Sequence, residues 1–175
     1  QSVEGGWGTY RPGFGDVSCI SITSHVISAL LEIGGSSKEI EKAIRWIRTS
    51  ISDQGYWKDF WLSRNTYGTA LAIEALIRTG NARCEEIERS VKWLESCQND
   101  DGGWGEDING QIIASTIEQT AWSSYALLLN DPDSASAKRG IDYILDHQNP
   151  DGSFDPSCVG IYWEVIGGYA DPIYP

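Results

Sequence analysis

Apolar residues recur at the three- and four-residue spacing of α-helices in six segments of this chain. Three segments alternate these residues with charges, as amphipathic helices do: residues 39–51, 85–97 and 135–147. Three others are richer in small and apolar residues, which indicates helices buried on more than one face: residues 21–35, 65–80 and 117–129. No segment sustains a period-two alternation, so we expect an all-α fold without β structure.

An aromatic ring stands in the loop after each amphipathic segment, and again near the start of the chain. In three loops a Gln precedes the ring by six residues, and a fourth loop keeps the ring without the Gln. The residues are Gln1 and Trp7, Gln98 and Trp104, Gln148 and Phe154, and Trp57 in the loop without the Gln. The copies begin near residues 1, 51, 98 and 148, which makes the chain a series of repeats.

Helix pairs repeated in this way form either an open solenoid or a closed ring of inner and outer helices, the α/α barrel. The low charge of the inner segments favours the barrel, because their second face must also leave water. Three helix pairs and the start of a fourth are fewer than the usual ring of about six. We therefore predict one partial α/α barrel domain over residues 1–175, with apolar surface left uncovered.

The loops are predicted to be structural. In QxxxGxW the Gln amide is expected to cap backbone groups at a helix end while the indole stacks near it. The acidic side chains of the third loop are then solvated loop carboxylates: Asp100, Asp101, Glu106 and Asp107. A calcium site in DDGGWGED is the alternative, although the glycines and the ring interrupt the usual alternation of ligands.

The composition and charge of the chain argue against some classes of function. A formal charge of -12 and a pI near 4.4 argue against a nucleic-acid ligand, because phosphate binding draws on clustered Lys and Arg. No apolar run reaches about 18 residues, which excludes a single-pass membrane protein but leaves attachment to a membrane surface open. The chain has no Met and starts at Gln1, as a fragment or a processed product would.

The four cysteines lie far apart, with no CxxC and no His at zinc-finger spacing. We expect reduced, mostly buried thiols and no bound metal. A disulfide stays open as an alternative. So does a metal site built from His147, Asp155 and Cys158.

The repeats resemble the QW motif of the class II terpene cyclases, the squalene-hopene and oxidosqualene cyclase group. The copies read QSVEGGW, QNDDGGW and QNPDGSF, with ISDQGYW as a degenerate copy, and STIEQTAW follows the third. The resemblance covers nearly the whole chain. It implies an α/α barrel enzyme without a cofactor that protonates an alkene or epoxide of a polyprenyl or triterpene substrate and closes rings through carbocations. Such cations need a dry cavity and aromatic faces.

The family's acid is the central Asp of a DxDD motif, which this chain lacks. The resemblance places that motif upstream, so we expect the carboxy-terminal part of a cyclase, inactive alone. Its partner is then an upstream segment, a partner chain that carries the motif, or a second copy of this chain. The resemblance also predicts a cytoplasmic or peripheral membrane location.

Two catalytic residues follow from the resemblance. His25 in SITSHV resembles the His that hydrogen-bonds the acid, and Tyr67 in WLSRNTYG resembles the Tyr that helps a water molecule reprotonate it. Trp61 resembles a Trp that borders the protonation site. Ser21 replaces a family Asp, so the polar network is expected to differ. For each functional residue the competing interpretation is a side chain of the core.

Further substrate contacts come from GIYWEVIGGY, which resembles the segment whose phenylalanines stabilise later cations. Ile161 and Val165 replace two of its rings, and Tyr169 keeps one. The missing rings favour a smaller or differently quenched substrate.

Two other functions compete with the cyclase. A helical-repeat binding module would complete its barrel with a partner chain. A protein prenyltransferase β-subunit shares the barrel but holds zinc with Asp, Cys and His, a pattern that this sequence lacks.

Overall fold

A computed structural model describes residues 1–9, 17–59, 64–106, 112–156, 160–164 and 167–171 of the chain. The six predicted helices are confirmed to within a few residues at each end. They are α1 (Ile20–Glu32), α2 (Ser37–Thr49), α3 (Asn65–Arg78), α4 (Glu85–Ser96), α5 (Ile117–Asn130) and α6 (Ala135–Asp146). The hydrophobic period located them correctly because each exceeds three turns and buries one continuous stripe.

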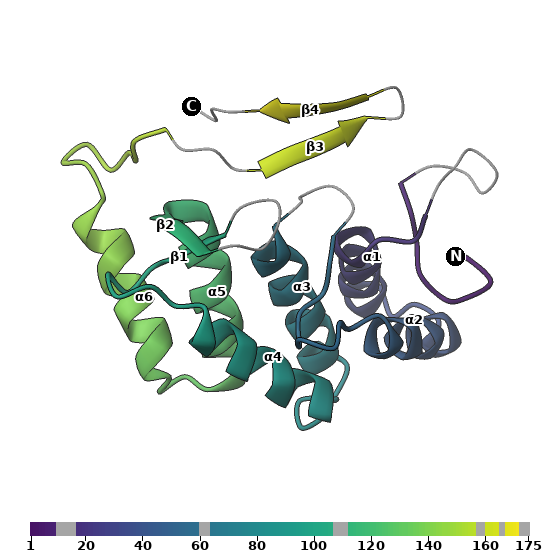
Figure 1. Ribbon diagram of the computed structural model, residues 1–175. Helices are drawn as coiled ribbons and strands as arrows, with labels where there is room; N and C mark the ends of the chain where they lie inside the picture. The colour runs from purple at the N-terminus through teal and green to yellow at the C-terminus, as the bar shows by residue number, and fades with distance from the viewer. Residues whose placement is uncertain (10–16, 60–63, 107–111, 157–159, 165–166, 172–175) are drawn as a thin grey trace.

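The helices form two layers (Figure 1). In the inner layer α3 packs between α1 and α5, while α2, α4 and α6 pack outside them. The inner α3 buries ten of its residues, but the outer α4 buries three. This difference matches the low charge of the inner segments. The chain is an arc of an α/α barrel, with its core between the layers.

The four aromatic loops share one backbone turn. In each, the second residue donates its N–H to the carbonyl of the sixth, as in Ser52 to Tyr56 and Asn99 to Gly103. The fifth residue is a glycine with positive φ, +97° at Gly55 and +88° at Gly102. A side chain at Gly102 would also meet a backbone carbonyl of α6 at 2.8 Å. The turn therefore requires glycine.

The indole caps the preceding outer helix. Trp57 Nε1 donates to the carbonyl of Ile47, and Trp104 Nε1 to that of Leu94, both at 2.7 Å and fully buried. These carbonyls belong to the last turns of α2 and α4, where helical partners run out. The indole, which was expected only to stack near the helix end, therefore makes the hydrogen bond to the end of the preceding helix.

The Gln amide instead links its loop to the next outer helix. Gln98 Nε2 donates to Gly102 O and to Ser136 O, both at 2.8 Å, and Gln1 makes the same pair of bonds with Gly5 and Glu39. The loop at residues 98–104 thus joins the outer helix before it, α4, through the ring to the one after it, α6, through the Gln. This chain of contacts holds neighbouring repeats in register.

The expectation of no β structure was wrong. Strand β1 (Trp104–Glu106) pairs antiparallel with β2 (Ile112–Thr116), and β3 (Gly160–Glu164) pairs with β4 (Gly167–Asp171). The strands of the first hairpin have three and five residues and alternate on neither face: β1 is buried throughout and β2 mostly exposed. A period-two alternation marks strands that have one buried and one exposed face. Neither of these two strands has such a pair of faces, so the alternation is absent from the sequence. Across the described helices, none combines the length and apolarity that a membrane crossing needs.

Candidate functional site

The inner helices carry equivalent positions that a repeated hydrogen bond identifies. The backbone N–H of each loop tryptophan donates to a threonine hydroxyl near the start of the following inner helix, at 2.8–3.0 Å. The pairs are Trp7 with Thr23, Trp57 with Thr69, and Trp104 with Thr120. Counting from these threonines aligns α1, α3 and α5 residue by residue.

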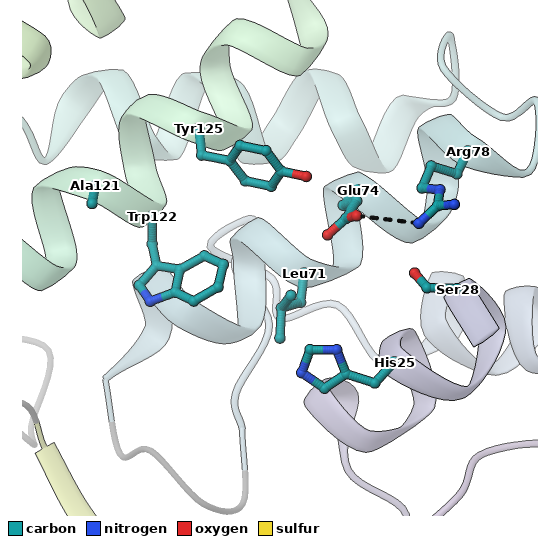
Figure 2. A pocket seen from close by; sticks show the side chains of 8 residues that line it. All are labelled: His25, Ser28, Leu71, Glu74, Arg78, Ala121, Trp122 and Tyr125. Carbon is teal, nitrogen blue, oxygen red and sulfur yellow. Dashed lines mark ion pairs between the residues drawn. The ribbon is translucent and has the colours of Figure 1, made fainter. Parts of the chain in front are cut away.

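The aligned positions line a hollow of about 490 Å³ on the inner face (Figure 2). The residues two after each Thr are His25, Leu71 and Trp122, and those five after are Ser28, Glu74 and Tyr125. Ala121 and Arg78 complete the lining. Three helices therefore contribute the same two positions, one turn apart, to a single site.

The two predicted catalytic side chains meet at this hollow. The Tyr67 hydroxyl lies 3.5 Å from His25 Nε2, although 42 residues separate them in the chain. The Tyr67 ring contacts Trp122 edge-on, with centroids 5.0 Å apart. Since His25 is exposed and Tyr67 half-buried, neither is the fully buried core residue of the competing interpretation. The cluster joins a titratable imidazole, a phenol and an indole face.

The opposite end of the hollow is charged. Arg78 pairs with Glu74 at 3.6 Å and with Glu32 of the neighbouring helix (Figure 2 draws the first pair). Burial, with Glu74 beside it, raises the pKa of the Tyr125 hydroxyl, so this phenol stays neutral. The lining thus changes from an aromatic end at Trp122 to an ionic end at Arg78.

Glu106 is not the solvated loop carboxylate that we expected. It is 5% exposed and accepts hydrogen bonds from Asn65 Nδ2 at 3.0 Å and from the Thr66 backbone N–H at 2.7 Å. The carboxylate caps the start of α3, where unpaired N–H groups favour negative charge. Burial raises its pKa, and the bonds from Thr66 and Asn65 oppose that rise.

In the preceding repeat an acidic side chain also caps the start of an inner helix. Asp59 Oδ2 accepts the backbone N–H of Ser21 at 2.8 Å, at the start of α1. Both acids stand two residues after a loop tryptophan, Trp57 or Trp104. An acid at that spacing was the signal in the sequence, and we missed it. It brings a carboxylate to Ser21, the position where the family resemblance expects an Asp.

Glu118 is a second carboxyl that sequence reasoning missed. Burial raises its pKa to about 7; Arg64 lowers the pKa, Glu106 raises it, and a hydrogen bond from Trp122 lowers it. Its Oε2 atom is buried and has no hydrogen-bond partner within the described part of the chain. Arg64 is 6% exposed and, among the same residues, its Nε and Nη1 also have no partner. A carboxyl with a pKa raised to about 7 is therefore influenced by a buried cation, Arg64.

The remaining predicted substrate contacts are not tested. Trp61 and Val165 lie outside the described residues. Ile161 falls on β3, opposite Ala170, and Tyr169 falls on β4, opposite Tyr162, but the described structure does not extend to their side chains. Their role in substrate binding stays a prediction.

The cysteines within the described ranges form no disulfide bond: Cys19, Cys84 and Cys97. Over those same ranges, no three His, Cys, Asp or Glu side chains gather as metal ligands. Cys158, part of the alternative metal site, lies outside them.

Comparison with known proteins places the chain in a family. Residues 11–160 match the squalene-hopene cyclase C-terminal domain. The chain belongs to the squalene-hopene cyclase family. It is 37% identical over 182 residues to the squalene-hopene cyclase of Alicyclobacillus acidocaldarius subsp. acidocaldarius, which covers 89% of this chain and 29% of that protein.

Solved structures agree with this assignment. The type II terpene cyclase MstE from Scytonema superposes with a TM-score of 0.70 at 26% identity, over 92% of this chain and 47% of that one. The ent-copalyl diphosphate synthase from Streptomyces platensis gives a TM-score of 0.67 at 25% identity, over 86% and 30%. The chain spans less than half the length of each of these relatives.

Proposed function

We propose that this chain is the part of a class II terpene cyclase that presents His25 and Tyr67 to a catalytic acid and an aromatic face to a cyclising polyprenyl chain. The observation that carries the proposal is the meeting of these two side chains in the hollow of a chain from this family. Neither residue protonates the substrate itself. An aspartic acid of a DxDD motif, from outside this chain, does so.

The reaction then has a defined proton balance. The O–H bond of the acid breaks, the electron pair of an alkene or epoxide takes the proton, and a cation forms that further double bonds attack. The last cation loses a proton or adds water. His25 hydrogen-bonds the acid and favours its release of the proton, and Tyr67 helps to return one. The faces of Trp122 and Tyr67 stabilise positive charge without forming a bond to it.

The substrate is a linear polyprenyl compound. The names of the relatives support this class, because squalene and copalyl diphosphate share an isoprenoid skeleton. The apolar part of the hollow, at Leu71, Ala121 and Trp122, suits such a chain. Ile161 and Val165 stand in place of two aromatic rings of the family. They favour a substrate shorter than squalene, or a carbocation that loses a proton or adds water at an earlier stage.

A second candidate is an assembly module, which the fourth loop favours. The first three glycines of the loops pack against an outer helix, and a side chain at Gly5, Gly55 or Gly102 would meet its backbone at 2.5–2.8 Å. At Gly152 the nearest atom among the described residues is 4.0 Å away and belongs to Gln148 of the same loop. Because no outer helix of that part of the chain packs on this loop, a helix from a second copy or a partner chain is the proposed neighbour. Gel filtration at several concentrations tests self-association.

The cyclase proposal is tested by product formation. The chain is incubated with polyprenyl substrates of several lengths, alone and with a separately expressed upstream segment that carries DxDD. Cyclised hydrocarbons from the mixture alone are the expected result. Products from the chain alone mean a different acid and overturn the mechanism, and none in either case moves the assignment to the assembly module.

A further inference from the structure

We propose that Glu118 is a proton-relay residue that passes protons from solvent to the His25–Tyr67 cluster between turnovers. The inference rests on the proposed cyclase function and adds to it a residue that the DxDD mechanism leaves unassigned. The first observation is the position of Glu118 on α5. Glu118 stands two residues before Thr120, the place that Tyr67 occupies before Thr69.

This alignment puts Glu118 on the inner face of α5, one turn before two residues of the hollow, Ala121 and Trp122. Trp122 connects the two sides of the cluster. Its ring contacts Tyr67 edge-on at 5.0 Å, and a hydrogen bond from it stabilises the Glu118 carboxylate. Tyr67 in turn lies 3.5 Å from His25. Trp122 therefore lies between Glu118 and Tyr67, and Tyr67 lies beside the imidazole, so these four side chains form one cluster along the inner face.

Glu118 also lies between the interior of the protein and its surface. Its Oε2 atom is buried and unpartnered within the described residues, while the residue as a whole is half-buried. A carboxyl in this position has one oxygen withdrawn from water, while part of the residue remains exposed. This arrangement is the one that a relay needs, since a fully buried acid could not refill and a fully exposed one could not deliver.

Two charged groups on the neighbouring elements act on this carboxyl. Arg64, just before α3, favours its ionised form, and Glu106 on β1 favours its neutral form. Glu106 already caps α3 through Thr66 and Asn65, so it serves as the fixed charge. With burial these effects bring the pKa of Glu118 to about 7, where loss and gain of a proton are both easy at neutral pH.

The relay conserves protons. After the catalytic acid has protonated the substrate, its carboxylate takes a proton from the Tyr67 hydroxyl, directly or through water. Tyr67 regains one, through water, from the Glu118 carboxyl, whose O–H bond breaks. The Glu118 carboxylate then takes a proton from solvent. No oxidant, reductant or further reactant is required.

The test compares the first turnover with later ones by rapid quench, in the mixture of this chain with the DxDD segment. Glu118→Gln should leave the first turnover unchanged, because the acid is already protonated, and should slow later turnovers about tenfold or more. Glu118→Asp keeps a carboxyl and should restore most of the rate. Glu95→Gln, an exposed carboxyl on the outer α4, is the matched control. Infrared titration should show a carboxyl near pH 7 that Glu118→Gln removes.

Two kinetic outcomes overturn the relay alone: wild-type later turnovers in Glu118→Gln, or first and later turnovers slowed equally, as a structural role would produce. A wild-type carboxyl that titrates near 4.5 also overturns it. If the wild-type mixture forms no cyclised product, the proposed function fails and the relay with it. Because infrared titration needs no turnover, the two failures are distinguishable.

Discussion

The substitution Trp104→Phe tests how the loops hold the repeats together. The indole is fully buried, and its Nε1 donates at 2.7 Å to Leu94 O in the last turn of α4. Phenylalanine keeps an aromatic ring but has no N–H and is smaller. The backbone bond from residue 104 to Thr120 does not depend on the side chain and should persist.

The magnitude follows from two losses. A buried N–H to carbonyl bond contributes about 1 kcal/mol. Leu94 O still accepts from Cys97 N at 3.2 Å, so it is not left unpaired. The smaller ring leaves a cavity worth about 1–2 kcal/mol more. The free energy of unfolding should fall by about 2–3 kcal/mol, a drop in Tm of about 5–10 °C for a chain of this size.

The assay is urea unfolding followed by circular dichroism, with a second substitution as a coupling test. A Cβ on Gly140 would lie 2.7 Å from Trp104 Cζ3. Gly140→Ala should therefore cost more in the wild-type chain than beside Trp104→Phe, which lacks that atom. A cost below about 0.5 kcal/mol for Trp104→Phe, or purely additive effects, would refute the account of the loop as a cap.

Three further predictions concern single side chains. Phe154→Trp should raise the free energy of unfolding by about 1 kcal/mol in urea titration, because it restores the indole donor that the second and third loops use; no gain would mean that the fourth loop is built differently. Glu106→Ala should cost about 2–4 kcal/mol in the same assay, since the buried donors of Asn65 and Thr66 lose their acceptor; a cost below 1 kcal/mol would contradict that capping role. Glu118→Gln should flatten the dependence of stability on pH. The raised pKa of Glu118 favours its protonated form in the folded chain, so the contribution of this group to stability is fully present below pH 4.5 and falls by about 2–3 kcal/mol as pH rises to about 7. Thermal melts across this range check it, and equal slopes in both chains would refute it.

The helices could be predicted because their signal is local. An apolar stripe over three turns is visible in the sequence whatever surrounds it, so α1 to α6 were located correctly. The hairpin β1–β2 could not be predicted in this way. Its strands are short, and the burial of β1 depends on helices that the sequence does not place beside it.

The site was predictable where the family resemblance named residues, as for His25 and Tyr67. Their closeness is a result of the helix register, which no local pattern carries. Glu106 was misjudged because its burial depends on the start of α3, about 40 residues earlier. Glu118 was overlooked because an acid in a first helical turn is ordinary. Its position on the inner face is recognised only when the hydrogen bonds between the loop tryptophans and the threonines align the inner helices.

The central claim is that His25 acts on the catalytic acid, and the most direct measurement is the rate of cyclised product formation by His25→Ala beside Ser28→Ala. Both side chains line the hollow, one turn apart on α1, so both substitutions change the lining of the same face and only the first removes an imidazole. In the mixture with the DxDD segment, His25→Ala should slow the first turnover about 100-fold, in line with the loss of one acid–base group. Ser28→Ala should change it less than about threefold. Equal effects of the two substitutions, or full activity of His25→Ala, would contradict the account.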